Sequence, residues 1–203
     1  MRSIFPFVFV LVVIATPVVA SAQTSGFAEV QSQLDFEAKR HEPMLDGGVT
    51  REIGDSFAVN TFFLLSNGWG EYLAGPEYRP TESLKFGAWG GLAHGPNAGR
   101  MIPRYGLSGS GQLDELFVSG FLEFDNDVVT GTDDVGMWYD VVATYTIFDG
   151  FAAGLHLRRP DGVGPRVQWT IGSMQAWASW TPYLLEESQW RSKHGLAGIL
   201  FFL

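Results

Sequence analysis

The 203-residue sequence has a formal net charge of −9, with 13 basic and 22 acidic side chains, and contains no cysteine. The acidic excess argues against a nucleic-acid partner, because binding to phosphates requires clustered lysine and arginine. The lack of cysteine excludes disulfides, thiol chemistry, cysteine-ligated metals and a lipidated N-terminal cysteine.

The N-terminal segment has the pattern of a secretory signal peptide. Arg2 supplies a positive start, residues 4–20 are apolar, and Ala20-Ser21-Ala22 is a small-x-small cleavage site. Two prolines interrupt the apolar run and argue against a retained transmembrane helix. We therefore expect residues 1–22 to be cleaved on export, leaving about 180 residues, enough for one domain with a sizeable core.

Residues 23–52 form an N-terminal segment of mixed character. Phe27 to Ala38 alternates between apolar and polar residues, and it is expected to be either a first strand or an amphipathic periplasmic segment. Arg40 to Ile53 is polar and contains a proline and two consecutive glycines, a composition typical of a loop. The main folded unit is therefore expected to occupy residues 53–203.

Nearly every segment after residue 53 alternates with the period of a β-strand. The first five predicted strands span about residues 57–65, 71–79, 84–92, 101–110 and 116–124. Pro103 weakens the fourth of these, since proline cannot donate to a strand ladder. Asp125 to Asp134 is an acidic loop.

The strongest signal is the pair of alternating runs between Val135 and Leu157, joined by Asp149-Gly150. Such an Asp-Gly link indicates a hairpin, because a type I′ turn needs positive φ at both central residues. The first run keeps one face apolar and carries Asp140 on the other. Its length fits a strand that crosses a membrane, which needs roughly 9–11 residues.

Two more strands are predicted near residues 167–171 and 176–184, and a last strand alternates through Ala197, Ile199, Phe201 and Leu203 to the chain end. In this terminal pattern the chain resembles bacterial outer-membrane β-barrel proteins, although it ends on leucine rather than the more common phenylalanine. The resemblance implies an outer-membrane location, contact with outer-membrane lipids, and recognition by the barrel assembly machinery. The residues of the implied assembly signal are Ile199, Phe201, Phe202 and Leu203.

The predicted fold is all-β: an antiparallel up-and-down transmembrane β-barrel of about ten strands, with eight or twelve as alternatives. Connections on the side of the C-terminus are short and the others longer, as in outer-membrane barrels. Tryptophan and tyrosine near strand ends, such as Trp69, Trp138 and Trp169, fit interfacial belts. A soluble periplasmic barrel with the apolar phase inward, binding an apolar ligand, is the alternative.

The strand positions that alternate with the apolar ones carry acidic and basic side chains in similar numbers. We interpret these side chains as a charge network inside the barrel, either purely structural or lining a narrow polar pore. The residues are Glu71, Glu77, Arg79, Lys85, Glu123, Asp140, His156, Arg158 and Arg166.

No catalytic residue, cofactor or metal site is expected. Ser192 and His194, with Glu186 and Glu187 nearby, are the best candidates for a nucleophile and base, yet no nucleophile elbow surrounds them. The four histidines lack metal-ligand spacing, and the acidic loop lacks the calcium-binding pattern of an EF-hand. The favoured function is a structural, adhesive or narrow-channel role, with an outer-membrane lipid-modifying enzyme as an alternative.

Overall fold

The computed structural model describes residues 23–95, 101–125, 136–184, 189–190 and 194–203. The expected signal peptide, residues 1–22, lies outside this range. Within the described part of the chain, no helix is long and apolar enough to cross a membrane.

The regular structure in these ranges consists of β-strands. The first seven are β1 (Thr24–Asp35), β2 (Arg40–Glu52), β3 (Phe57–Ser66), β4 (Trp69–Thr81), β5 (Leu84–His94), β6 (Ile102–Leu113) and β7 (Leu116–Asp125). The others are β8 (Met137–Phe148), β9 (Phe151–Arg158), β10 (Gly162–Ile171), β11 (Met174–Trp180), β12 (Tyr183–Leu184), β13 (Gln189–Trp190) and β14 (His194–Phe202).

The strands form one closed antiparallel barrel. Each strand from β1 to β10 pairs with the next, and β14 pairs with both β11 and β1. Strands β12 and β13 are two-residue pieces attached beside β10, so twelve strands make up the wall. The predicted fold class is confirmed. The barrel has twelve strands, the larger of the two alternatives, rather than ten.

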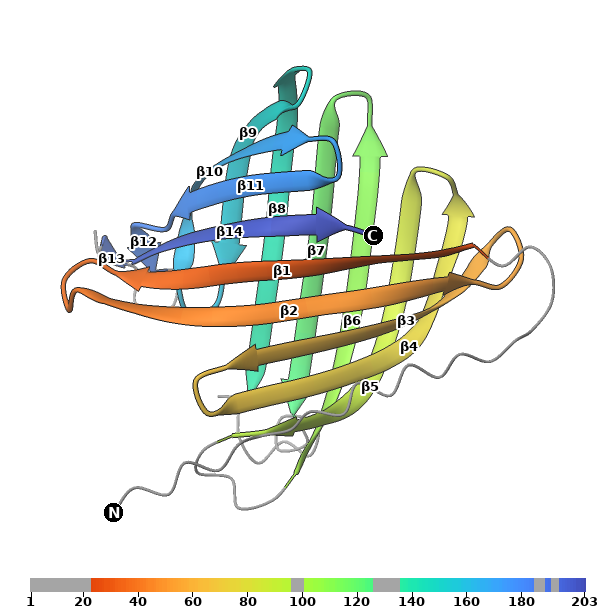
Figure 1. Cartoon of the computed structure of the whole chain (residues 1–203), viewed down its shortest axis with the longest axis horizontal. Helices are drawn as coiled ribbons and strands as arrows, with labels where there is room; N and C mark the ends of the chain where they lie inside the picture. Colours follow the sequence, from red (N-terminus) through yellow and green to blue (C-terminus); the bar gives the residue numbers. More distant parts are fainter. Residues whose placement is uncertain (1–22, 96–100, 126–135, 185–188, 191–193) are drawn as a thin grey trace.

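The two walls of the barrel cross each other. In Figure 1, β14, β1 and β2 run across the front while β6, β7 and β8 run steeply behind them. This crossing follows from closure, since the strands of a barrel tilt from its axis by typically 35–45°. The C-terminus and the turns at residues 82–83, 114–115, 149–150 and 172–173 share one end, called the turn end here, and the opposite end is the loop end.

The interpretation of Arg40 to Ile53 as a loop is wrong, because residues 40–52 form β2. Pairing with β1 and β3 supplies hydrogen-bond partners on both edges of this strand. Its glycines make room for aromatic rings from the neighbouring strands: a Cβ on Gly48 would lie 2.9 Å from the Phe27 ring, and one on Gly47 would lie 2.9 Å from Phe63. Glycine here therefore serves packing between rings and backbone rather than a turn.

The apolar phase faces outward and the polar phase faces the interior. In the hairpin of β8 and β9, Tyr145 and Leu155 are 54% and 58% exposed, whereas Thr144 and His156 are 2% and 1% exposed. An outer surface of this kind requires hydrocarbon around it. The alternative of a soluble barrel with an apolar interior therefore does not fit this structure.

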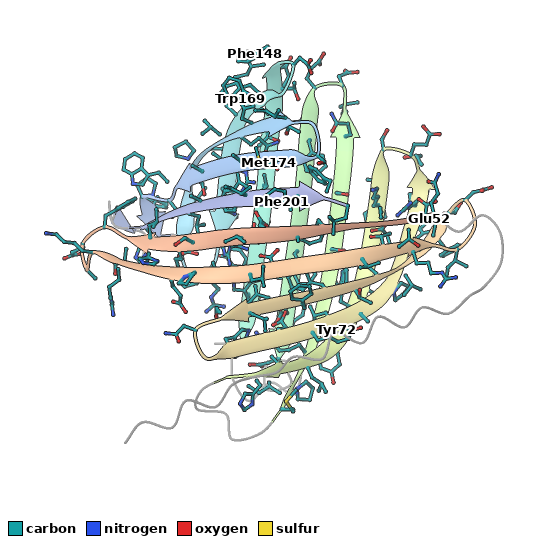
Figure 2. All side chains as sticks on the ribbon, in the orientation of Figure 1. Glu52, Tyr72, Phe148, Trp169, Met174 and Phe201 are labelled. Atoms are coloured by element: carbon teal, nitrogen blue, oxygen red, sulfur yellow. The ribbon has the colours of Figure 1, made fainter. Side chains whose placement is uncertain are left out.

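Outward aromatic side chains gather at the turn end. The Phe148 ring lies 5.0 Å from Phe151 and 6.2 Å from Trp169, and Figure 2 shows Phe148 and Trp169 together at that rim. Such clusters are typical of the girdles at membrane interfaces. Trp69 and Trp138, however, were predicted for the belts and instead line the interior cavity.

Candidate functional site: the barrel interior

An interior cavity of about 610 Å³ runs along the barrel. Its lining reaches from Ser66 and Pro160 near the loop end to Lys85 and Thr50 near the turn end. Among the described residues, eight carboxyl side chains line it against three basic ones. The acids are Glu29, Glu42, Asp46, Glu71, Glu77, Glu123, Asp140 and Asp161, and the bases are Lys85, Arg104 and Arg158.

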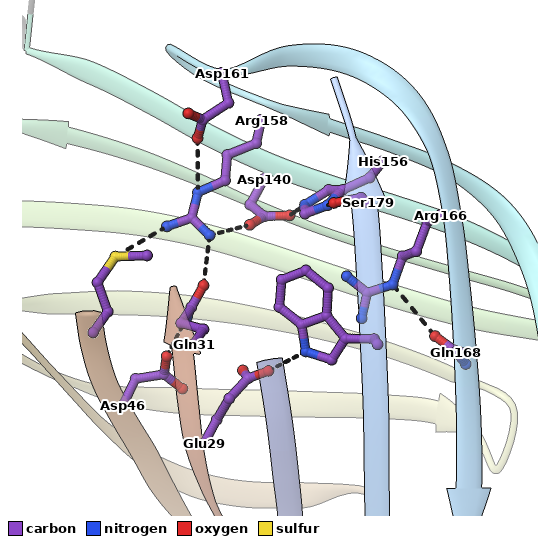
Figure 3. Close-up of polar contacts among 12 residues, drawn as sticks. Glu29, Gln31, Asp46, Asp140, His156, Arg158, Asp161, Arg166, Gln168 and Ser179 are labelled. Atoms are coloured by element: carbon purple, nitrogen blue, oxygen red, sulfur yellow. Dashed lines mark hydrogen bonds and ion pairs between the residues drawn. The ribbon is translucent and has the colours of Figure 1, made fainter. Parts of the chain in front are cut away.

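Arg158 is the centre of an extended polar network, whose side chains come from β1, β2, β8, β9, β10 and β11 (Figure 3). Its guanidinium lies 3.5 Å from an Asp140 oxygen and 3.6 Å from an Asp161 oxygen. It also donates to the Gln31 amide oxygen at 2.9 Å and lies 5.2 Å from the centre of the Trp138 ring. Arg158 thus connects β8 and β9 to β1 across the interior, although β10, β11 and β14 separate β9 from β1 along the wall.

Asp161 closes this network at the loop end, in the turn between β9 and β10. Its side chain accepts a hydrogen bond from the Gln33 amide of β1. Burial raises the pKa of the Asp161 carboxyl, and the Arg158 guanidinium beside it opposes that rise. The residue is 2% exposed, so its charge depends on Arg158 for compensation.

The same network contains a serine, a histidine and an aspartate in contact. His156 Nδ1 lies 2.8 Å from Ser179 Oγ, and His156 Nε2 lies 2.8 Å from Asp140 Oδ1. These residue types also make up nucleophile, base and acid triads. Here His156 is 1% and Ser179 7% exposed, and neither lines the cavity. A substrate in the cavity would therefore not reach this hydroxyl.

Trp177 contacts two further charged side chains in the interior. Its indole N–H donates to Glu29, and the Arg166 guanidinium lies over its ring, 4.0 Å from the centre. Arg166 is therefore held by a ring face, with a long 3.4 Å hydrogen bond to Gln168 beside it.

A second cluster surrounds Arg104 at the loop end. Its guanidinium contacts Glu123 and lies 3.7 Å from both Glu71 and Asp125. The Trp69 ring lies 5.2 Å away. Three carboxylates thus share one guanidinium, which leaves this mouth of the cavity acidic.

A third cluster lies toward the turn end. Arg79 pairs with Glu77 at 2.6 Å and with Glu52 at 2.7 Å. Asn60 donates to the second oxygen of Glu77 at 2.9 Å. Lys85 lines the cavity nearby, and no ion pair of Lys85 is found within the described residues.

Five aromatic residues form a bridge through the middle of the cavity. Ring centres lie 6.5 Å apart for Phe27 and Phe62, 6.5 Å for Phe62 and Phe121, 5.8 Å for Phe121 and Trp89, and 6.2 Å for Phe121 and Trp138. Strands β4, β5 and β6 separate Phe62 on β3 from Phe121 on β7. At a strand spacing of about 4.8 Å, these residues are roughly 19 Å apart along the wall, so their rings meet inside the lumen. We call these five side chains the aromatic bridge.

All nine residues predicted for the interior charge network lie on the interior side of the wall. The structure divides them among three clusters: Glu71 and Glu123 around Arg104, Glu77 around Arg79, and Asp140, His156 and Arg166 around Arg158, with Lys85 alone among the described residues. That they act together as a structural network stays a prediction.

Several interior charges are not evident from alternation along the sequence. Asp46 lies in the segment that the sequence predicts as a loop, Asp161 in the turn between β9 and β10, and Arg104 in the strand weakened by proline. Glu29 lay on the polar phase of a segment whose pairing was left open. The same alternation test, applied to residues 40–52 with glycine counted as a strand residue, would have placed Asp46 inside.

Most of the candidate catalytic residues fall outside the described part of the chain. Ser192, Glu186 and Glu187 lie outside the described residues, and His194 is the first residue of β14. Most of the acidic loop also lies outside them, while Asp125 at its start belongs to the Arg104 cluster. Across the described ranges, no group of three or more His, Asp or Glu side chains has the arrangement of a metal site.

Neither a known family model nor a curated protein matches this sequence. Solved structures do match its fold. The KdgM porin is 10% identical with a TM-score of 0.53, over 86% of this chain and 98% of that one. The NanC porin is 9% identical with a TM-score of 0.53, over 87% and 99%. A structure from work on in-meso crystallization of membrane proteins is 12% identical with a TM-score of 0.56, over 88% and 83%. The resemblance to bacterial outer-membrane β-barrel proteins is thereby confirmed, and the chain has the fold of the small outer-membrane porins.

Proposed function

We propose that this protein is a narrow outer-membrane channel that passes small polar solutes and prefers cations to anions. The observation that carries the proposal is the cavity, whose lining spans the barrel from one end to the other with eight acidic and three basic side chains. A pore wall with one sign of charge in excess raises the local concentration of the opposite ion. The porin fold of the solved neighbours supports the channel role in this proposal.

The location follows from the outer surface. An apolar band around the barrel must contact hydrocarbon, so the protein should pellet with outer membranes and resist carbonate extraction. A folded barrel should also migrate differently from a boiled sample on a denaturing gel. Release of the mature protein into the soluble periplasmic fraction would contradict this part of the proposal.

Conductance across a planar lipid bilayer tests the channel and its selectivity together. The reversal potential in a KCl gradient should show a preference for potassium. The gradient should be centred near 0.1 M, where the Debye length is about 10 Å, because higher salt screens the wall charges.

Two cavity-lining residues offer matched variants of opposite sign. Glu42 lies near the loop end and Lys85 near the turn end, and neither forms an ion pair within the described residues. Glu42→Gln should therefore lower the cation preference and Lys85→Gln should raise it, with little change in stability. Absence of conductance from the folded protein, or a preference for chloride, would refute the proposal.

A further inference from the structure

The aromatic bridge lies among carboxylates, and this combination suits one class of solute. Its five rings are only partly buried, and all of them line the cavity. Aromatic faces carry negative potential and attract cations, and they also offer apolar area to the body of a solute.

The barrel already shows that its ring faces hold cations. Arg104 lies over Trp69 and Arg158 over Trp138, each 5.2 Å from the ring centre, and Arg166 lies over Trp177. No such cation covers the rings of Phe27, Phe62, Phe121 or Trp89 among the described residues. The middle of the bridge therefore keeps ring faces available to a cation that enters from outside.

Glycines beneath the rings fix how these faces are presented. A Cβ on Gly106 would lie 2.8 Å from the Phe121 ring, and one on Gly48 would lie 2.9 Å from the Phe27 ring. These rings thus rest closely on the backbone of a neighbouring strand. A platform that is already ordered loses little conformational entropy when a solute stacks on it.

We propose that the aromatic bridge is a binding site for organic ammonium ions, cations that join a positive nitrogen to an apolar or aromatic body. The cavity carboxylates attract the positive charge, and the bridge stacks against the apolar body. The proposal deepens the channel function and rests on it for access, but the binding itself does not require ion flow. An organic anion of equal size should be excluded by the same carboxylates.

Benzyltrimethylammonium and benzenesulfonate are suitable probes, because each joins a single aromatic ring to a charged group and the charges are opposite. Binding to the purified, folded protein in detergent micelles is measured by isothermal titration and by quenching of tryptophan fluorescence. We expect saturable binding of the cation, with the anion at least tenfold weaker. Equal binding of the two ions, or no saturable binding of the cation, would overturn the proposal.

Phe121→Leu removes the central ring but keeps an apolar side chain, and Phe62→Leu does the same on the opposite wall. Each should weaken cation binding by about twofold to thirtyfold, the range for loss of one cation–π contact. Phe86→Leu is the matched control, because Phe86 faces outward and is 51% exposed. Unchanged affinity in both bridge variants, with folding verified by heat-dependent gel migration, would refute the assignment of the site.

Current recordings separate this proposal from the channel proposal. Benzyltrimethylammonium should reduce the potassium current of the wild type and do so less in Phe121→Leu. Binding in micelles without any conductance would support the site and refute the channel. Conductance without binding would refute the site and leave the channel intact.

Discussion

Replacing Arg158 by alanine should cause a large loss of stability, because it removes the shared cation of two interior carboxylates. The side chain is 8% exposed and lies 3.5 Å from Asp140 and 3.6 Å from Asp161. It also donates to Gln31 at 2.9 Å. Alanine would remove all three contacts and leave both carboxylates inside the barrel.

Breaking a buried ion pair by removing one partner typically costs about 3–5 kcal/mol. Asp140 would keep its 2.8 Å contact with His156, and its side chain is 23% exposed, so solvent and imidazole offset part of the loss. Asp161 is 2% exposed and would keep only the Gln33 amide among the hydrogen-bond partners described above. We therefore expect the free energy of unfolding to fall by about 3 kcal/mol, the lower end of that range.

Equilibrium urea unfolding in phospholipid vesicles, followed by tryptophan fluorescence, measures this change. Arg40→Ala is the control, since Arg40 is also an arginine paired with a carboxylate. Its side chain is 79% exposed and lies 3.8 Å from Asp35. Exposed pairs contribute at most about 1 kcal/mol, so this variant should unfold nearly as the wild type does.

A loss of less than about 1 kcal/mol in Arg158→Ala, equal to that of Arg40→Ala, would refute the reasoning. The double variant Arg158→Ala/Asp161→Asn gives a second check. If an uncompensated carboxylate causes the loss, then neutralising Asp161 should recover part of it, and the two changes should not be additive. Additive losses would mean that packing of the arginine side chain, rather than its charge, stabilises the barrel.

Three further predictions concern lipid contact, packing and assembly. Val141→Arg places a charge on the outer face of β8 and should lower the free energy of unfolding by roughly 2–4 kcal/mol near the membrane midplane. Ser119→Arg, at similar depth on the cavity side of β7, should be tolerated. Equal losses of stability in the two variants would contradict the assigned faces. Gly154→Ala should lower the free energy of urea unfolding by about 1–3 kcal/mol, because the added Cβ would clash with the Ala143 carbonyl. Gly90→Ala is the control and should cost under about 0.5 kcal/mol, because the space around Gly90 is open. Phe201→Ser should lower the fraction of heat-modifiable barrel in cells if the terminal strand is the assembly signal, and wild-type levels would argue against that role.

The sequence by itself determined which side chains share a face of each strand. Alternation with period two separates Val141 from Asp140 and Leu155 from His156, and the structure keeps each pair on opposite faces. The reason is local, because successive side chains of any strand point to opposite sides whatever the strand pairs with. The continuous apolar face, the Asp149-Gly150 turn, the terminal strand and the signal-peptide pattern together predicted an antiparallel membrane barrel, and the exposed fractions of the side chains then showed that the apolar face points outward.

The strand number was not determined locally. Residues 40–52 contain Pro43, Gly47 and Gly48, which weaken any strand considered alone. Pairing makes them acceptable: Pro43 lies beyond the end of β3, where one edge of β2 has no partner, and the two glycines lie under rings from β1 and β3. Those neighbours exist only once β1 and β3 have paired with β2.

Only the tertiary structure decided which interior groups meet. Arg158 and Gln31 are 127 positions apart in the sequence, yet a hydrogen bond joins them. Phe62 and Phe121 lie on strands separated by three others, and their rings meet inside the lumen. Alternation places each of these side chains on the interior face of its strand, but it contains no information about the curvature of the wall. The curvature and tilt of the closed barrel bring distant strands within side-chain reach, and these properties belong to the whole sheet rather than to any segment of it.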